Sequence, residues 1–214
     1  LIMVYFEEPD HSGHNFGPQD VHTKNALRDM DGMLQDLWDN VQNGPRKDSV
    51  NMIVVSDHGM TLVSPERKIE CRKYLKPYWF DRIEGNLPAQ IYCKKQYIDS
   101  VYNALKDIPH QRVWRRNEIP AYLHYDSNKN IGDVVVSPDE GWLVYDQKVT
   151  TGGMHGYDPE YSDMHALFRA MGPDFKKTEI PHFRNVDVYD LLCKLLNITP
   201  AKNDGNLEEI KSIL

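Results

Sequence analysis

The chain has 214 residues, with 32 Asp and Glu against 25 Lys and Arg, which gives a formal net charge of −7 at pH 7. This length predicts one domain, and 40% hydrophobic residues with 10% aromatic residues are enough to build a hydrophobic core. The acidic balance argues against binding of duplex nucleic acid, which needs clustered basic side chains, but not against a small phosphate ester held by metal ions.

A strand, a helix and a second strand are predicted at the N-terminal end. Residues 1–6 are continuously apolar, which is typical of a strand buried on both faces. Apolar residues recur at intervals of three and four over residues 20–41, which indicates an amphipathic helix that ends at Asn43-Gly44-Pro45. Residues 51–55 predict another buried strand. This order indicates a right-handed βαβ unit, so we expect the loops after both strands at one edge of a parallel sheet.

The later part of the chain has shorter elements. Residues 59–85 lack a clear pattern and are expected to be irregular. A cap-like insertion with βαβ-ββ order is predicted over residues 86–146, with its strands at 89–93, 112–114, 133–137 and 141–145 and its helix at 97–107. The main sheet should resume near 166–171, before a final helix over 186–196. The predicted fold class is α/β, with a mostly parallel sheet flanked by helices on both faces.

Five side chains that could bind metal follow these predicted strands. Asp10 and His14 are four residues apart after the first strand, so one helical turn would bring both to one point. Asp57 and His58 follow the second strand, directly before a glycine that frees the backbone to turn both toward one ion. His155 lies in a glycine-rich stretch that permits close approach.

Carboxylates and imidazoles without a thiolate favour zinc, with manganese or iron as alternatives. Two catalytic zinc ions with three protein ligands each need about six ligands, so the set is about one carboxylate short. With few carboxylates, two ions keep a surplus positive charge that suits a phosphate. Each of these pairs, taken alone, also fits an ordinary loop or core role.

Three runs of sequence resemble the motifs of a known family. These are YFEEPDHSGHNFGP at 5–18, SDHGM at 56–60 and HGYD at 155–158. They are similar to those of the nucleotide pyrophosphatase/phosphodiesterases, the type I phosphodiesterases of the alkaline phosphatase superfamily. The resemblance runs from residue 1 almost to the C-terminus and is weakest over 67–86.

The resemblance implies an alkaline-phosphatase-like fold with two Zn²⁺ ions. One ion would be held by Asp10, His14 and His155. The other would be held by Asp57 and His58, together with a further Asp and the catalytic threonine. It also implies that the residue at position 5, a tyrosine, stacks on a nucleobase, with a plain core position as the alternative.

The further Asp and the threonine have no match here, because the family places both before the strand with which this chain begins. Ser12, Ser56 and Thr61 stand at positions that the family does not use as a nucleophile. We therefore expect residues 1–214 to be the C-terminal part of a longer catalytic domain, inactive by itself. The implied reaction is hydrolysis of phosphodiester or pyrophosphate bonds in nucleotides and related small esters, through a covalent phosphothreonine.

Two alternatives stay open. The stretch from residue 168 to residue 205 resembles lipid-directed members of the family as much as the nucleotide ones, and a lipid-directed member would be a choline-phosphodiesterase or sphingomyelinase-like hydrolase of phospholipid head groups. A non-catalytic metal-binding remnant without a nucleophile is the second alternative. Relatives imply an extracellular, periplasmic or membrane-anchored location, although no apolar run reaches the roughly 18 residues of a transmembrane segment. The sequence leaves the oligomeric state open.

Overall fold

The computed structural model describes residues 1–126, 128–144 and 151–214. Its contacts divide the chain into two compact units. The terminal unit contains Leu1–Phe6, Arg28–Asp57 and Ala166–Leu214, and the central unit contains Glu7–Leu27 and His58–His165. In chain order the α-helices and β-strands are α1 (Asp10–Phe16), α2 (Val21–Gln42), β1 (Met52–Val55), β2 (Thr61–Val63), β3 (Lys68–Ile69), β4 (Phe80–Glu84), β5 (Ala89–Cys93), α3 (Ile98–Leu105), β6 (Gln111–Arg115), β7 (Val134–Pro138), β8 (Leu143–Val144), β9 (Gly152–Met154), β10 (Phe168–Met171) and α4 (Asp187–Leu195).

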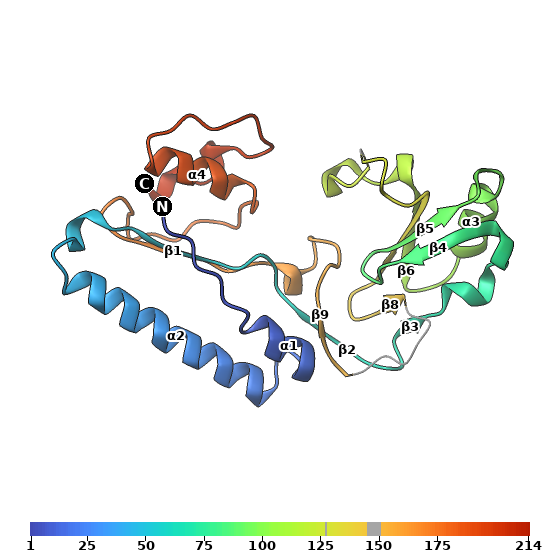
Figure 1. Ribbon diagram of the computed structural model, residues 1–214, viewed down its shortest axis with the longest axis horizontal. Helices are drawn as coiled ribbons and strands as arrows, with labels where there is room; N and C mark the ends of the chain where they lie inside the picture. The colour runs from blue at the N-terminus through green and yellow to red at the C-terminus, as the bar shows by residue number, and fades with distance from the viewer. Residues whose placement is uncertain (127, 145–150) are drawn as a thin grey trace. The chain divides into compact units, whose positions relative to one another are not determined.

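The terminal unit is built on an antiparallel pair of strands. β1 pairs with β10, with Met52 opposite Met171 at one end and Val55 opposite Phe168 at the other (Figure 1). Helix α4 contributes Leu191 to a buried cluster with Ile210 and Ile213, and side chains of both strands pack against it. The strand predicted at 51–55, the presence of a strand near 166–171 and the helix at 186–196 are therefore confirmed.

The predicted strand at the N-terminus is wrong. Leu1–Phe6 forms no strand, and its side chains are exposed, from 42% for Phe6 to 89% for Ile2. An apolar run shows only that a segment can be buried, whereas a strand also needs a hydrogen-bonded neighbour, which the sequence does not reveal. The parallel βαβ unit inferred from this run is not formed either, and β1 is half-buried with Val55 exposed.

Helix α2 confirms the helix predicted at 20–41 and ends just before Asn43-Gly44. Its buried residue is Thr23, whose hydroxyl donates to the carbonyl oxygen of Gly17 at 2.8 Å. The apolar side chains Leu27, Met33 and Leu37 are about half exposed. The 3.6-residue period therefore identified the helix correctly, although the amphipathic stripe is largely uncovered.

The central unit contains a four-stranded antiparallel sheet in the order β4-β5-β7-β6 (Figure 1). β7 is buried along its whole length, and it pairs with β5 on one side and with β6 on the other. Val134 and Val136 face the main cluster, which includes Val101 and Leu105 of α3, whereas Val135 faces a second cluster with Ile119 and Ile131 on the other side. Continuous burial of Val-Val-Val thus reflects a strand covered on both faces.

The segment before the predicted insertion contains strands that the sequence did not indicate. Residues 59–85 are not irregular, since they contain β2, β3 and β4. β4 pairs with β5 and so joins the sheet expected within 86–146, while β8 pairs with β3 outside that range. The predicted strand at 141–145 is present as β8, but residues 145 and 146 lie outside the described residues. Short strands of two or three residues carry too little periodicity to be recognised.

The expected mostly parallel sheet is absent from the described parts of the chain. There, β3 with β8 is the only parallel pair, and the other paired strands run antiparallel. The α/β composition is confirmed. The parallel arrangement depended on pairing Leu1–Phe6 with β1, and that pairing does not occur.

Candidate metal centre

Helix α1 and strand β9 lie against each other in the central unit (Figure 1). Glycines permit this approach, because a Cβ on Gly153 would lie 2.6 Å from the carbonyl oxygen of Gly13, and one on Gly152 would collide with that of His14. Gly152 also has φ +149°, which side chains rarely adopt. Close contact of helix and strand backbones therefore brings the residues flanking these glycines together.

The side chains of Asp10, His14 and His155 converge as expected from the sequence. Asp10 Oδ1 is 3.5 Å from His14 Nε2 and 3.6 Å from His155 Nε2, and the two Nε2 atoms are 3.2 Å apart. Asp10 and His14 come from the first and last turns of α1, four residues apart on one face. The carboxylate is 40% exposed and the two imidazoles about one third, so the cluster is open to solvent on one side.

The ring nitrogens of the histidines are oriented by backbone carbonyls. His14 Nδ1 lies 2.8 Å from the carbonyl oxygen of Gly153, and His58 Nδ1 lies 2.8 Å from that of Gly59. A carbonyl only accepts hydrogen bonds, so in each case Nδ1–H donates, and the lone pair of the neutral imidazole is on Nε2. This tautomer presents Nε2 as a metal ligand, and a carbonyl behind the ring is the usual arrangement at metal-bound histidines.

His58 adjoins the same cluster. Its ring stacks on that of His155, with centroids 3.4 Å apart and planes inclined by 10°, and its Nε2 is 3.9 Å from Asp10 Oδ1. One carboxylate oxygen is therefore surrounded by three imidazole nitrogens. Among the residues that the structure describes, Asp10 Oδ1 is buried and has no hydrogen-bond partner.

These atoms fit a zinc ion. Zinc lies about 2.0–2.1 Å from nitrogen and oxygen ligands, so neighbouring ligands of a tetrahedral ion are separated by about 3.4 Å. The three separations among Asp10 Oδ1, His14 Nε2 and His155 Nε2 run from 3.2 to 3.6 Å. A carboxylate oxygen left unbonded beside them is costly unless a cation compensates it. The donor set and its spacing thus match a divalent cation that takes oxygen and imidazole ligands.

The other two predicted site residues lie in the terminal unit. Asp57 follows β1 and is exposed, and in the described part of the chain it is not one of the converging ligands. Tyr5 is 79% exposed, so it is not a core residue of the described chain. The assignment of Asp57 with His58 to a second ion, and of Tyr5 to a nucleobase, stay predictions.

Sequence reasoning missed the residues that hold the ligands in place. Glu8 accepts hydrogen bonds from the backbone N–H of Ser12 at 3.1 Å and from its hydroxyl at 3.0 Å, which caps the first turn of α1. The i, i+4 spacing of Glu8 and Ser12 was a local signal that could have found this cap. The contact of Gly153 with His14 had no such signal, because 139 residues separate the two.

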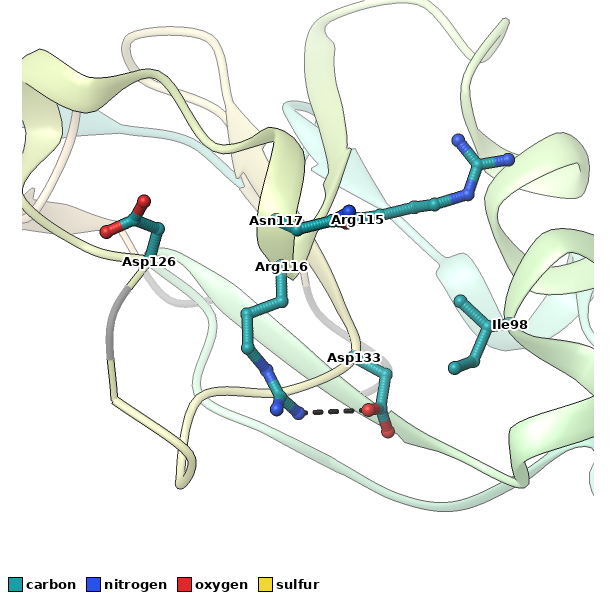
Figure 2. Close-up of a pocket in the computed structure, with 6 residues that line it drawn as sticks. All are labelled: Ile98, Arg115, Arg116, Asn117, Asp126 and Asp133. Atoms are coloured by element: carbon teal, nitrogen blue, oxygen red, sulfur yellow. Dashed lines mark hydrogen bonds and ion pairs between the residues drawn. The ribbon is translucent and has the colours of Figure 1, made fainter.

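A pocket of about 270 Å³ in the central unit is lined by Ile98, Arg115, Arg116, Asn117, Asp126 and Asp133 (Figure 2). Arg116 is paired with Asp133 at 2.9 Å, and Arg115 with Asp99 at 2.7 Å. Both guanidinium charges are compensated by carboxylates, so the pocket has no surplus charge for an anion. The converging histidines, and not this pocket, are the candidate site.

The described helices include none with the length and apolar character needed to cross a membrane.

Comparison with known proteins gives consistent matches. A family model described as type I phosphodiesterase / nucleotide pyrophosphatase matches residues 1–158. Ectonucleotide pyrophosphatase/phosphodiesterase family member 7 of Rattus norvegicus is 32% identical over 216 residues, which cover 96% of this chain and 49% of the relative. Bis(5'-adenosyl)-triphosphatase enpp4 of Xenopus laevis is 34% identical over 218 residues, which cover 100% of this chain and 48% of the relative.

A solved structure of an inactive variant of murine ectonucleotide pyrophosphatase/phosphodiesterase 5, in complex with AMP, matches with a TM-score of 0.90 and 34% identity. The match covers 98% of this chain and 57% of that chain. The chain thus spans about half the length of the curated relatives it matches. These findings confirm the resemblance drawn from the three motifs, and the chain belongs to the type I phosphodiesterase/nucleotide pyrophosphatase family.

Proposed function

We propose that this chain carries part of the metal centre of a zinc-dependent hydrolase that cleaves phosphodiester or pyrophosphate bonds in nucleotides and related small esters. One observation carries the proposal. Asp10 Oδ1 is buried without a hydrogen-bond partner in the described chain and lies 3.5 to 3.9 Å from the Nε2 atoms of three histidines. That arrangement is unfavourable for the metal-free protein and favourable for a bound cation.

Asp10, His14 and His155 would hold one ion. The sequence motif supports Asp57 and His58 as ligands of a second ion. When bound, zinc ions act as Lewis acids that neutralise the charge of a phosphate and lower the pKa of an attacking oxygen. The residues of the chain orient the ligands for this, since the carbonyl oxygens of Gly153 and Gly59 accept from Nδ1 of His14 and His58 and leave Nε2 of each ring to bind a metal.

The proposed covalent step needs a hydroxyl nucleophile, and two hydroxyls near the site are engaged elsewhere. Ser12 Oγ donates to Glu8 at 3.0 Å, and Thr61 Oγ1 donates to Asp163 at 2.8 Å. A hydroxyl that donates to a carboxylate keeps its oxygen lone pairs and could still attack a phosphate. The expectation that a different hydroxyl, a threonine, forms the phosphoenzyme therefore rests on the family pattern alone.

The names of the relatives support a nucleotide substrate. One is called a bis(5'-adenosyl)-triphosphatase, and the solved murine relative is described in complex with AMP. Several relatives carry the prefix "ecto". We therefore propose a small nucleotide ester as substrate and a site of action outside the cytoplasm, whether extracellular, periplasmic or on an outward-facing membrane anchor.

The test is hydrolysis of two chromogenic esters by the complete gene product and by residues 1–214, each loaded with Zn²⁺. We expect the complete gene product to cleave p-nitrophenyl thymidine monophosphate faster than p-nitrophenylphosphorylcholine, and Asp10→Asn to abolish both reactions. The opposite order of rates would replace the nucleotide substrate with a phospholipid head group. Zinc binding without turnover of either ester would identify a non-catalytic metal-binding remnant, and the proposed activity would be wrong.

A further inference from the structure

Asp158 is a buried carboxylate near the metal centre that the proposed function does not use. Its side chain is 2% exposed, and it accepts three hydrogen bonds. The donors are the hydroxyl of Tyr122 at 2.5 Å, Nη1 of Arg112 at 2.8 Å and the backbone N–H of Glu160 at 2.9 Å. Although burial alone raises the pKa of Asp158, the bonds from Tyr122, Glu160 and Arg112 lower it below the usual range, so the buried group is a carboxylate.

The two side-chain donors come from the region of the four-stranded sheet. Arg112 lies on β6, and Tyr122 lies in a 3-10 turn, Ala121–Leu123, that follows it. The guanidinium of Arg112 also lies 5.9 Å from the ring of Tyr161, in the same loop as Asp158. Asp158 therefore links the loop after β9 to a sheet strand more than 40 positions earlier in the chain.

That loop carries the third metal ligand. His155 precedes Asp158 by three residues, which span at most about 10 Å of chain. Gly156 lies between them with φ +103° and does not restrict the backbone as other residues would. Tyr157 is buried among apolar side chains, and its contacts there are mainly those of hydrophobic packing. Asp158 follows directly and is held by an ion pair with Arg112 and a hydrogen bond from Tyr122.

We propose that Asp158, held by Arg112 and Tyr122, is a positioning residue that keeps His155 within metal-binding distance of Asp10 and His14. The four-stranded sheet then sets the metal affinity of the site in addition to stabilising the fold. This inference rests on the metal centre of the proposed function, but not on its phosphodiesterase activity. Residues that orient metal ligands typically change metal affinity about 10- to 100-fold when they are substituted.

The test measures metal binding by the chain of residues 1–214. Asp158→Asn keeps the shape of the side chain and removes its negative charge. Arg112→Met removes the opposing positive charge, whereas Arg112→Lys keeps it. The matched control is Asp187→Asn in the terminal unit. Asp187 is also fully buried and accepts bonds from Arg184 and from the backbone N–H of Asn206. Zn²⁺ affinity is measured by competition with a chromophoric chelator, and coordination by the visible absorption of bound Co²⁺.

We expect Asp158→Asn and Arg112→Met to lower Zn²⁺ affinity about 10- to 100-fold and to change the Co²⁺ spectrum, with recovery in Arg112→Lys. Asp187→Asn should destabilise the fold and leave affinity within about twofold of the wild type. If Asp158→Asn fails to fold, Tyr122→Phe tests the positioning role instead, because loss of its one hydrogen bond to Asp158 should lower Zn²⁺ affinity about threefold to tenfold.

Two results separate this inference from the proposed function. If the wild-type chain does not bind Zn²⁺ or Co²⁺, the metal centre itself is wrong, and the positioning role falls with it. If the wild type binds metal and the Asp158, Arg112 and Tyr122 variants keep its affinity and its Co²⁺ spectrum, only the positioning role is wrong.

Discussion

Substitution of Gly153 by alanine tests whether the close contact of α1 and β9 creates the metal centre. A Cβ at this position would lie 2.6 Å from the carbonyl oxygen of Gly13 and would also collide with the sulfur of Met60. The Met60 side chain is flexible and can turn away. The Gly13 carbonyl belongs to the backbone of α1 and can move only with the helix.

The required movement follows from these distances. Real Cβ contacts are essentially never below 3.0 Å, so α1 and β9 must separate by at least about 0.4 Å. Metal–ligand distances tolerate only about ±0.2 Å. Because His14 is on α1 and His155 directly follows β9, the separation pulls ligands apart by more than an ion accepts. We expect Zn²⁺ affinity to fall about 10- to 100-fold and the free energy of unfolding to fall by about 1–3 kcal/mol.

Chelator competition and the Co²⁺ spectrum measure the first effect, and chemical denaturation of the metal-free chain measures the second. The matched control is Gly32→Ala in α2, where a Cβ would meet nothing within 4 Å. This change should leave metal affinity unaltered and stabilise the helix by up to about 1 kcal/mol. Wild-type Zn²⁺ affinity together with an unchanged Co²⁺ spectrum in Gly153→Ala would refute the explanation of the site by backbone approach.

Three further predictions follow from other buried groups. Asp10→Asn should lower Zn²⁺ affinity at least about 100-fold. The midpoint of thermal unfolding of the metal-free chain should stay equal or rise, because Asp10 Oδ1 lacks a hydrogen-bond partner in the described chain. A clear drop in that midpoint would contradict this reasoning. Since the native pKa of Asp158 is lowered, its stabilising effect is fully present above the unfolded pKa of about 3.9 and is lost as the pH falls through the native pKa. Denaturation of wild type and Asp158→Asn should therefore differ at pH 7 and converge at low pH, and equal differences at both would be inconsistent with this linkage. Burial raises the pKa of Cys93 to about 12, so iodoacetamide at pH 8 should alkylate it much more slowly in the native than in the unfolded chain, as mass spectrometry of the peptide will show.

Local patterns predicted much of this chain. The repeat of apolar residues identified α2 and α4, and the family motifs identified Asp10, His14 and His155 by residue identity and order along the chain. The i, i+4 spacing of Asp10 and His14 is itself sufficient to place both on one face of α1. In these cases the structural outcome depends on residues within one or two turns of each other, which is the range over which sequence periodicity acts.

Pairing over long distances could not be predicted in the same way. Leu1–Phe6 has the composition of a buried strand, but the segment is exposed and forms no strand. In contrast, β2, β3 and β4 form in a segment whose sequence has no evident pattern. Each strand requires a partner whose hydrogen bonds match its own, and that partner lies far away in sequence, as β10 does from β1.

The sequence by itself determined the ligand types and the family of this protein, because both depend on residue identity and short spacing. Only the tertiary structure decided that His155 reaches Asp10 and His14. The glycines of β9 let two backbones touch, a carbonyl 139 residues away orients His14, and Asp158 ties the ligand loop to the four-stranded sheet. These contacts join distant segments, and their geometry depends on packing at the scale of tenths of an ångström, which no local pattern encodes.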